Sequence, residues 1–245
     1  MGIEGKVALI TGGSRGIGAA IAERLAADGA DIALTYNASA ERAEEVVSRI
    51  RETGRRAVAV HAPAADQEAV PAAVDRTVAE FGRLDILVNN AGIFPYGTID
   101  ELTMEQFDET MNLHVRAPFA AARAASPHLG EGGRIISIGS NLAERATQPG
   151  LSLYSMSKAA LIGFTKGLAR DLGPRGVTVN VVQPGSTDTE MNPADSPPAD
   201  AQRAATALGR YATATEIASA VAYLAGEGGN FVTGSTLTVD GGANA

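Results

Sequence analysis

The chain has 245 residues, of which 45% are hydrophobic and 20% are charged, and its formal net charge is −8. This composition is typical of a globular protein and excludes a disordered chain. The negative charge disfavours general affinity for nucleic acid or anionic lipid, and the absence of cysteine excludes disulfides and thiolate chemistry. We see no basic and apolar leader, no apolar run long enough to span a membrane and no metal-ligand spacing among the three histidines. We therefore expect a cytoplasmic protein that binds no nucleic acid, membrane or metal.

Apolar runs and amphipathic segments alternate along the chain. In order, the pattern predicts a strand over 6–11, helix 16–28, strand 31–36, helix 39–53, strand 56–61, helix 66–81, strand 84–89, one long or two abutting helices over 101–125 with a kink at Pro118, strand 134–139, helix 152–172, strand 177–182, a substrate lid over 186–212, helix 215–225 and strand 235–239. Most of the strands are continuously apolar, as are strands buried on both faces. The predicted fold is α/β, a single domain over 1–245 with a doubly wound, parallel, seven-stranded sheet flanked by helices on both faces.

A glycine-rich turn, T-G-G-S-R-G-I-G at residues 11–18, joins the first strand to the first helix. Gly12 permits the tight turn, and Gly16 and Gly18 remove side chains where a ligand and the first strand approach the helix. The N–H groups and the positive dipole end of the helix then face a pyrophosphate. The spacing differs from G-x-G-x-x-G, but the physics is the same, and it predicts a Rossmann dinucleotide-binding fold.

The residues after the second strand indicate which dinucleotide binds. The segment Tyr36-Asn37-Ala38-Ser39 lacks the acidic residue that holds the ribose 2′-hydroxyl of NAD. Arg15 lies in the glycine loop, where its guanidinium can bind a 2′-phosphate. The lack of an acidic residue after the second strand and the presence of Arg15 predict that the protein binds NADP(H). The alternative is that Arg15 is only a solvated loop charge.

Three polar residues form a candidate catalytic set. Tyr154 and Lys158 lie four residues apart in a predicted helix and therefore share one face. We expect the ammonium, together with the positive charge of an oxidised nicotinamide, to lower the tyrosine pKa from about 10, so that the phenol can exchange a proton with a carbonyl or alcohol oxygen. Ser140 follows the fifth strand at the carboxyl edge of the sheet and can hold the same oxygen. The Tyr-Lys spacing and a serine after a strand each occur often by chance, so the prediction depends on their combination with the glycine loop.

Together these motifs resemble those of the classical short-chain dehydrogenase/reductase family, with a 3-oxoacyl-(acyl-carrier-protein)-reductase-like sequence. The resemblance runs from residue 6 to residue 242 and covers the glycine loop, N-N-A-G at 89–92, Asn112, Ser140, Y-S-M-S-K at 154–158, Asn180 and P-G at 184–185. It implies direct hydride transfer between a nicotinamide and a carbonyl carbon, without a metal. In the implied catalytic set, Tyr154 is the acid/base and Ser140 polarises the carbonyl. Lys158 holds the ribose and lowers the tyrosine pKa, and Asn112 bends its helix and anchors a proton-relaying water.

The resemblance, with the residue arguments, also implies binding contacts. The expected cofactor-binding residues are Gly12, Ser14, Arg15, Gly16, Ile17, Gly18, Tyr36, Asn37, Ser39, Ala64, Asn90, Ala91, Gly92, Tyr154, Lys158, Pro184, Gly185, Thr187 and Thr189. The expected substrate-binding residues are Phe94, Tyr96, Ser140, Asn141, Leu142 and Tyr154. Relatives usually form tetramers through the helices over 101–125 and 152–172 and the last strand, so a homotetramer is expected.

Two departures from the family pattern bear on the ligands. Pro63 stands where an aspartate usually lies near the adenine, so the adenine would rely on the Ala64 backbone or on Asp66. Glu131 lies in the segment where carrier-protein reductases have basic docking residues, which favours a small free carbonyl substrate.

Two other functions stay open at this stage. One is a regulatory protein that senses NADPH or a cyclic dinucleotide, because residues 133–194 resemble the branch of cyclic-di-GMP-binding biofilm-dispersal mediators. The other is a non-redox descendant, such as a lyase or a dehalogenase, which the intact lysine and glycine loop disfavour. The substrate, its stereochemistry and the direction of the reaction are not determined by the sequence.

Overall fold

The computed structural model describes residues 2–64 and 66–245, and in them seven parallel strands form one sheet in the order β3-β2-β1-β4-β5-β6-β7. The strands are β1 (Val7–Ile10), β2 (Asp31–Tyr36), β3 (Ala57–His61), β4 (Ile86–Asn89), β5 (Arg134–Ile138), β6 (Thr178–Pro184) and β7 (Thr236–Val239). The strand order reverses between β1 and β4. In open α/β sheets, ligands bind outside the carboxyl ends of the strands at this reversal.

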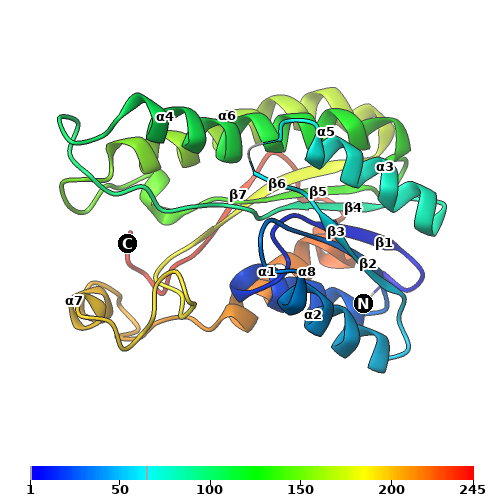
Figure 1. Ribbon diagram of the computed structural model, residues 1–245, viewed down its shortest axis with the longest axis horizontal. Helices are drawn as coiled ribbons and strands as arrows, with labels where there is room; N and C mark the ends of the chain where they lie inside the picture. The colour runs from blue at the N-terminus through cyan, green and yellow to red at the C-terminus, as the bar shows by residue number, and fades with distance from the viewer. Residues whose placement is uncertain (1, 65) are drawn as a thin grey trace.

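Helices cover both faces of the sheet (Figure 1). One layer holds α1 (Gly16–Ala27), α2 (Ala40–Glu52) and α8 (Ala214–Ala225), and the other holds α3 (Ala69–Phe81), α4 (Met104–Met111), α5 (Ala117–Ala125) and α6 (Ser152–Leu172). Side chains of successive strand residues pack into the apolar clusters on opposite faces of the sheet. For example, Leu9 packs in the cluster under α3, α5 and α6, and Ile10 packs in the cluster under α1, α2 and α8. This two-sided burial explains the continuous apolar runs and confirms the predicted doubly wound Rossmann fold.

The sequence predicts one long helix or two abutting helices over 101–125, and the structure has two, with the interruption before Pro118. The helix α4 ends at Met111, a π-helical turn covers Asn112–Arg116, and α5 begins at Ala117. Pro118 is the second residue of α5, which directly follows this turn. The break therefore comes from the π-helical turn, which inserts an extra residue into the helical repeat.

Two predicted helix starts also differ from the structure. The helix predicted from residue 66 begins at Ala69, because the Asp66 carboxylate accepts the N–H of Glu68 in a preceding turn. Ser39 precedes α2, but its side chain makes no capping hydrogen bond.

The lid over 186–212 contains the short helix α7 (Ala199–Ala204), which lies apart from both helical layers and beside the C-terminus (Figure 1). A parallel bridge between Thr187 and Ala212 closes the base of the lid. The N–H of Leu208 donates to the carbonyl of Gly241 at 3.1 Å. The lid and the C-terminal turn thus form one wall at the carboxyl edge of the sheet. Across the described ranges, no helix has the length and apolar character needed to cross a membrane.

Candidate active site

The glycine loop between β1 and α1 adopts a conformation that requires its glycines. Gly12 and Gly16 have φ of 66° and 53°, which side chains rarely permit. A Cβ on Gly12 would lie 2.9 Å from the Ala91 Cα, and one on Gly18 would lie 2.3 Å from the Gly12 carbonyl oxygen. The turn therefore presents backbone and the N-terminus of α1 at the carboxyl edge, the surroundings that fit a dinucleotide pyrophosphate.

Two threonines that the sequence argument did not identify hold this loop. The Thr11 hydroxyl accepts the N–H groups of Asn90 at 2.9 Å and Ala91 at 3.1 Å, and the Thr35 hydroxyl accepts the N–H of Gly12 at 3.0 Å. The Asn90 amide donates to the carbonyls of Thr11 at 2.9 Å and Gly12 at 3.0 Å. Asn90 thus shapes the loop from the β4 side, and its contact with the cofactor stays a prediction.

The segment after β2 is tied to the end of β3. The Asn37 side-chain oxygen accepts the N–H of Ala64 at 3.1 Å, and the Asn37 carbonyl lies 2.8 Å from Nε2 of His61. The rings of Tyr36 and His61 pack with their centres 5.3 Å apart. The Ala64 N–H and the Asp66 carboxylate, expected to replace the missing aspartate at the adenine, are thus both engaged within the protein.

Arg15, expected at the 2′-phosphate, is paired with a residue of the lid. Its Nη1 lies 3.1 Å from Oε2 of Glu190, and Nη1 of Arg42 lies 2.6 Å from the same oxygen. These contacts hold the pKa of Glu190 below its usual range, with the Arg42 hydrogen bond making the largest contribution. Neither Arg42 nor Glu190 stands out in the sequence, because only the fold brings them to the glycine loop.

The structure brings the three predicted catalytic side chains together. Tyr154 and Lys158 lie in α6, and Ser140 follows β5. The buried Lys158 ammonium donates to the carbonyl of Ile138 at 3.0 Å and lies 5.8 Å from the centre of the Tyr154 ring. The Ser140 oxygen accepts the N–H of Leu142 at 3.2 Å, and its hydrogen bond with Tyr154 lowers the pKa of the phenol.

Burial dominates the pKa values of this cluster. Loss of water raises the pKa of Tyr154 above 10.0, and the hydrogen bond with Ser140 opposes this shift only in part. Loss of water also lowers the pKa of Lys158 to about 8. In the cofactor-free protein, burial therefore determines the direction of both shifts, because desolvation disfavours the charged form of both groups. The lowering of the Tyr154 pKa by Lys158 and an oxidised nicotinamide stays a prediction.

His114, in the π-helical turn, is a central residue of the site that the sequence argument missed. Its Nε2 accepts the N–H of Ile93 at 3.0 Å, so Nδ1 carries the proton and donates to Ser157 Oγ at 2.8 Å. That hydroxyl in turn donates to the Tyr154 carbonyl at 2.7 Å. Burial, and secondarily the nearby Lys158, lowers the pKa of His114 to about 3, so the ring is neutral. The ring thus joins the π-helical turn, the loop after β4 and α6.

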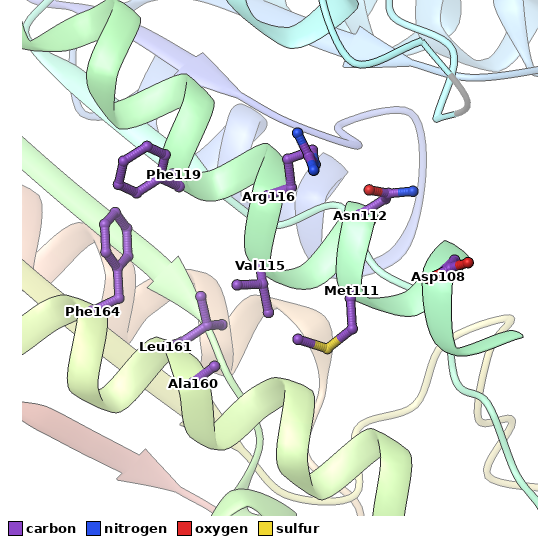
Figure 2. Close-up of a pocket in the computed structure, with 9 residues that line it drawn as sticks. All are labelled: Asp108, Met111, Asn112, Val115, Arg116, Phe119, Ala160, Leu161 and Phe164. Carbon is purple, nitrogen blue, oxygen red and sulfur yellow. The ribbon is translucent and has the colours of Figure 1, made fainter. Parts of the chain in front are cut away.

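Asn112 begins the π-helical turn, at the position where the family resemblance implies a bend. Its carbonyl accepts the N–H of Ala117, five residues ahead. Figure 2 shows its side chain at the rim of a groove between this turn and α6. Among the described residues, no hydrogen bond joins Asn112 to Lys158, and the proton-relaying water stays a prediction.

Two aromatic residues of the expected substrate site border Tyr154. The ring centres of Phe94 and Tyr154 lie 4.8 Å apart in an edge-to-face arrangement, and those of Phe94 and Tyr96 lie 6.3 Å apart in a stacked one. Both Phe94 and Tyr96 are exposed. They therefore offer an accessible apolar wall next to the phenol.

The other expected substrate residues lie in the short turn after Ser140, where Leu142 is half-buried. Asn141 is buried, and its amide donates to Asp240 at 3.4 Å. The Asn141 carbonyl accepts the amide of Asn244 at 2.8 Å. Asn141 thus holds the C-terminal turn against the loop that carries Ser140, and its contact with a substrate stays a prediction.

The remaining expected cofactor residues lie along the same edge: Ser14 and Ile17 in the glycine loop, Ser39 before α2, Ala91 and Gly92 after β4, Pro184 and Gly185 at the end of β6, and Thr187 and Thr189 in the lid. A Cβ on Gly92 would lie 3.1 Å from Nε2 of His114 and 3.5 Å from Nζ of Lys158, so Gly92 borders the catalytic cluster. Direct contacts of these residues with the cofactor stay predictions.

Comparisons with known proteins agree with this geometry. A family model described as enoyl-(acyl carrier protein) reductase matches residues 12–244. A short-chain dehydrogenase from Burkholderia cenocepacia J2315, solved in complex with NADP, is 61% identical, with a TM-score of 0.98 and 99% of each chain covered. A blue fluorescent protein from a metagenomic library, solved in complex with NADPH, is 52% identical, with a TM-score of 0.98 and 100% of each chain covered.

One curated relative has a name that points beyond redox chemistry. The cyclic-di-GMP-binding biofilm dispersal mediator protein of Escherichia coli strain K12 is 45% identical over 237 residues, which cover 97% of this chain and 96% of the relative. The two structural relatives, one solved with NADP and the other with NADPH, nevertheless share the fold of this chain. The chain belongs to the short-chain dehydrogenase/reductase family.

Proposed function

We propose that the protein reduces the carbonyl group of a ketone or a 3-oxoacyl compound to a secondary alcohol, and that NADPH is the hydride donor. The observation that carries this proposal is the meeting of Tyr154, Lys158 and Ser140 beside the glycine loop. A protein that only binds a nucleotide does not need a half-buried phenol next to a buried ammonium and a buried hydroxyl. The NADP(H) complexes of the structural relatives support the choice of cofactor.

Each side chain has a defined task in this reaction. Bound NADPH supplies a hydride to the carbonyl carbon. Tyr154 then donates its phenolic proton to the carbonyl oxygen, and in the reverse direction it accepts the proton of the alcohol. Because the Ser140 oxygen accepts the N–H of Leu142, its hydrogen is available to stabilise the negative charge that develops on the substrate oxygen.

The other two residues of the set support this proton transfer. Lys158 holds the nicotinamide ribose and keeps a positive charge close to the phenol. Asn112, at the start of the π-helical turn, anchors the water that returns a proton to Lys158. His114 keeps the helix that carries Tyr154 in place through Ser157.

The surroundings of the site favour a small free carbonyl compound as substrate. The exposed rings of Phe94 and Tyr96 suit an apolar or aromatic substrate next to Tyr154. Glu131 is exposed in the segment where carrier-protein reductases have basic docking residues, and a carboxylate repels an acidic carrier.

The test is NADPH and NADH oxidation across a panel of free ketones, diketones and a 3-oxoacyl thioester. We expect turnover that selects NADPH, and a Tyr154→Phe variant that loses activity by about 10²-fold to 10⁴-fold while still binding NADPH. Tyr223→Phe, on the exposed face of α8, is the matched control and keeps full activity. Full activity in Tyr154→Phe would refute the assigned acid/base.

The second candidate is a regulatory protein that binds a cyclic dinucleotide, and the similarity to the Escherichia coli mediator supports it. A titration with cyclic-di-GMP, with and without NADPH, separates the two functions. Saturable binding without turnover of any panel member would favour regulation.

We also propose a homotetramer in the cytoplasm, where a reductase meets its NADPH supply. The groove in Figure 2 has a volume of about 440 Å³, and its apolar lining residues include Val115, Phe119, Leu161 and Phe164 from the π-helical turn, α5 and α6. Phe231, before β7, is fully exposed. The groove lies on the helices expected in the subunit interfaces, and Phe231 precedes the last strand expected there. Light scattering of the purified protein tests the oligomeric state.

A further inference from the structure

Arg15, Arg42 and Glu190 meet at one point although they lie in three separate segments. Arg15 immediately precedes α1, Arg42 lies in the first turn of α2, and Glu190 follows Thr189 in the lid. Both guanidinium groups contact the same carboxylate oxygen, at 3.1 Å from Arg15 and 2.6 Å from Arg42. The meeting point lies where β1 and β2 end, on the side of the sheet that carries the glycine loop.

Two converging guanidinium groups fit a phosphate monoester better than they fit a carboxylate. Such a phosphate carries nearly two negative charges at neutral pH and offers three acceptor oxygens, whereas Glu190 offers one charge. Arginine also matches phosphate geometry through paired N–H donors. The cofactor brings a phosphate of this kind on its 2′-oxygen, beside the residues that follow the second strand.

We propose that Arg15 and Arg42 together form the 2′-phosphate site, and that Glu190 fills this site in the cofactor-free protein and is displaced by NADPH. Arg42 then selects NADPH over NADH. Glu190 weakens this selection, because NADPH must displace its carboxylate whereas NADH, without the 2′-phosphate, does not. The proposal rests on the proposed position of the 2′-phosphate at Arg15.

The exposure of the three side chains permits this exchange. The side chains of Arg15, Arg42 and Glu190 are 57%, 49% and 51% exposed, and exposed ion pairs contribute little to stability. A Cβ on Gly16 would lie 3.5 Å from the methyl group of Thr189, so this part of the lid covers the glycine loop. Displacement of Glu190 therefore releases an anchor of the lid directly above the loop.

The experiment measures dissociation constants of NADPH and NADH, by nicotinamide fluorescence, for the complete protein and its variants. Arg15→Ala and Arg42→Ala should each weaken NADPH binding about tenfold or more, since charge-assisted bonds to phosphate are lost. Glu190→Gln should tighten NADPH binding roughly twofold to fivefold, the range of an exposed ion pair. NADH binding should stay within about twofold of the unmodified protein in all three variants, because NADH makes none of these phosphate contacts.

Two variants serve as matched controls. Arg49→Ala removes another exposed arginine of α2, which pairs with Glu23 at 2.7 Å. Asp200→Asn breaks the ion pair with Arg203 at 2.6 Å within the lid. Neither pair lies at the proposed site, so both variants should bind NADPH and NADH normally.

Each other outcome overturns a defined part of the proposal. Unchanged or weaker NADPH binding in Glu190→Gln would refute displacement. Equal losses for NADPH and NADH in Arg42→Ala would refute its role in selection. Unchanged NADPH binding in Arg15→Ala would show that the 2′-phosphate does not bind at this site. Because only binding is measured, failure of the proposed carbonyl reduction would leave these results interpretable.

Discussion

Replacing Thr11 with valine keeps the shape of the side chain and removes a single hydroxyl group. In the structure, the Thr11 oxygen accepts two backbone N–H groups, those of Asn90 at 2.9 Å and Ala91 at 3.1 Å. The side chain is buried, so water does not replace it easily. An unsatisfied buried donor costs ~1–3 kcal/mol. Because Thr11→Val leaves two half-buried N–H groups without this acceptor, it should lower the free energy of unfolding by about 2–4 kcal/mol.

Thr165→Val is a matched control for this substitution. Thr165 lies in α6 and is fully buried, and its hydroxyl is without a hydrogen-bond partner in the described part of the chain. Threonine and valine have similar helix propensities. Removing this hydroxyl leaves no N–H group unpaired, so the variant should be as stable as the unmodified protein or more stable.

Urea denaturation of both variants, at one protein concentration and without cofactor, measures the difference. Thr11→Val should also weaken NADPH binding, because Asn90 and Ala91 border the glycine loop, whereas Thr11→Ser keeps the hydroxyl and should bind NADPH normally. Equal stability of Thr11→Val and Thr165→Val would refute the reasoning. It would mean that the two N–H groups find other partners.

Three further predictions follow from burial and close packing. Lys158→Met should stabilise the cofactor-free protein at pH 7 while abolishing turnover, since it removes a buried charge. Because the folded pKa of about 8 lies below 10.5, the unfolded chain binds more protons between these values, so the advantage of the variant in urea denaturation should shrink as the pH rises from 8 to 10.5. As the pH falls from 6.5 toward 3, the His114→Gln variant should lose less stability than the unmodified protein, by up to about 1.4 kcal/mol per pH unit. Denaturation curves over this pH range measure the difference. Gly18→Ala should weaken NADPH binding in fluorescence titrations, because its Cβ would lie 2.3 Å from the Gly12 carbonyl oxygen. The control Gly167→Ala has open space around its Cβ in α6 and should raise the free energy of unfolding, measured in urea, by ~0.5–1 kcal/mol. A Lys158→Met protein less stable at pH 7, an unchanged pH slope in His114→Gln, or normal binding by Gly18→Ala would contradict the respective argument.

The features that the sequence predicts well depend on neighbouring residues. Both ends of α6 are predicted at Ser152 and Leu172, because a periodic apolar segment ends at a Gly-Pro pair. The common face of Tyr154 and Lys158 follows from their spacing on a helix. The glycine loop is recognised because backbone conformations with positive φ leave few choices of residue. These local rules were enough for the order of strands and helices along the chain.

The π-helical turn marks the limit of such local rules. The sequence predicts a kink at Pro118, but the regular helix already ends at Met111, because a π-helical turn begins at Asn112. His114 is a lone histidine in the sequence, yet it joins three segments in the structure. No spacing pattern shows this, since its partner Ser157 lies 43 residues away.

Electrostatics and distant partners were decided by the tertiary structure alone. The pKa of Tyr154 rises, although Lys158 is its helical neighbour, because burial in the folded protein removes water from both groups. Arg15 meets Glu190 across 175 residues, because the lid folds back over the glycine loop. Residue order along the chain determines helices, turns and the glycine loop through short-range sterics. Burial and charge pairing depend instead on which surfaces the folded chain brings together.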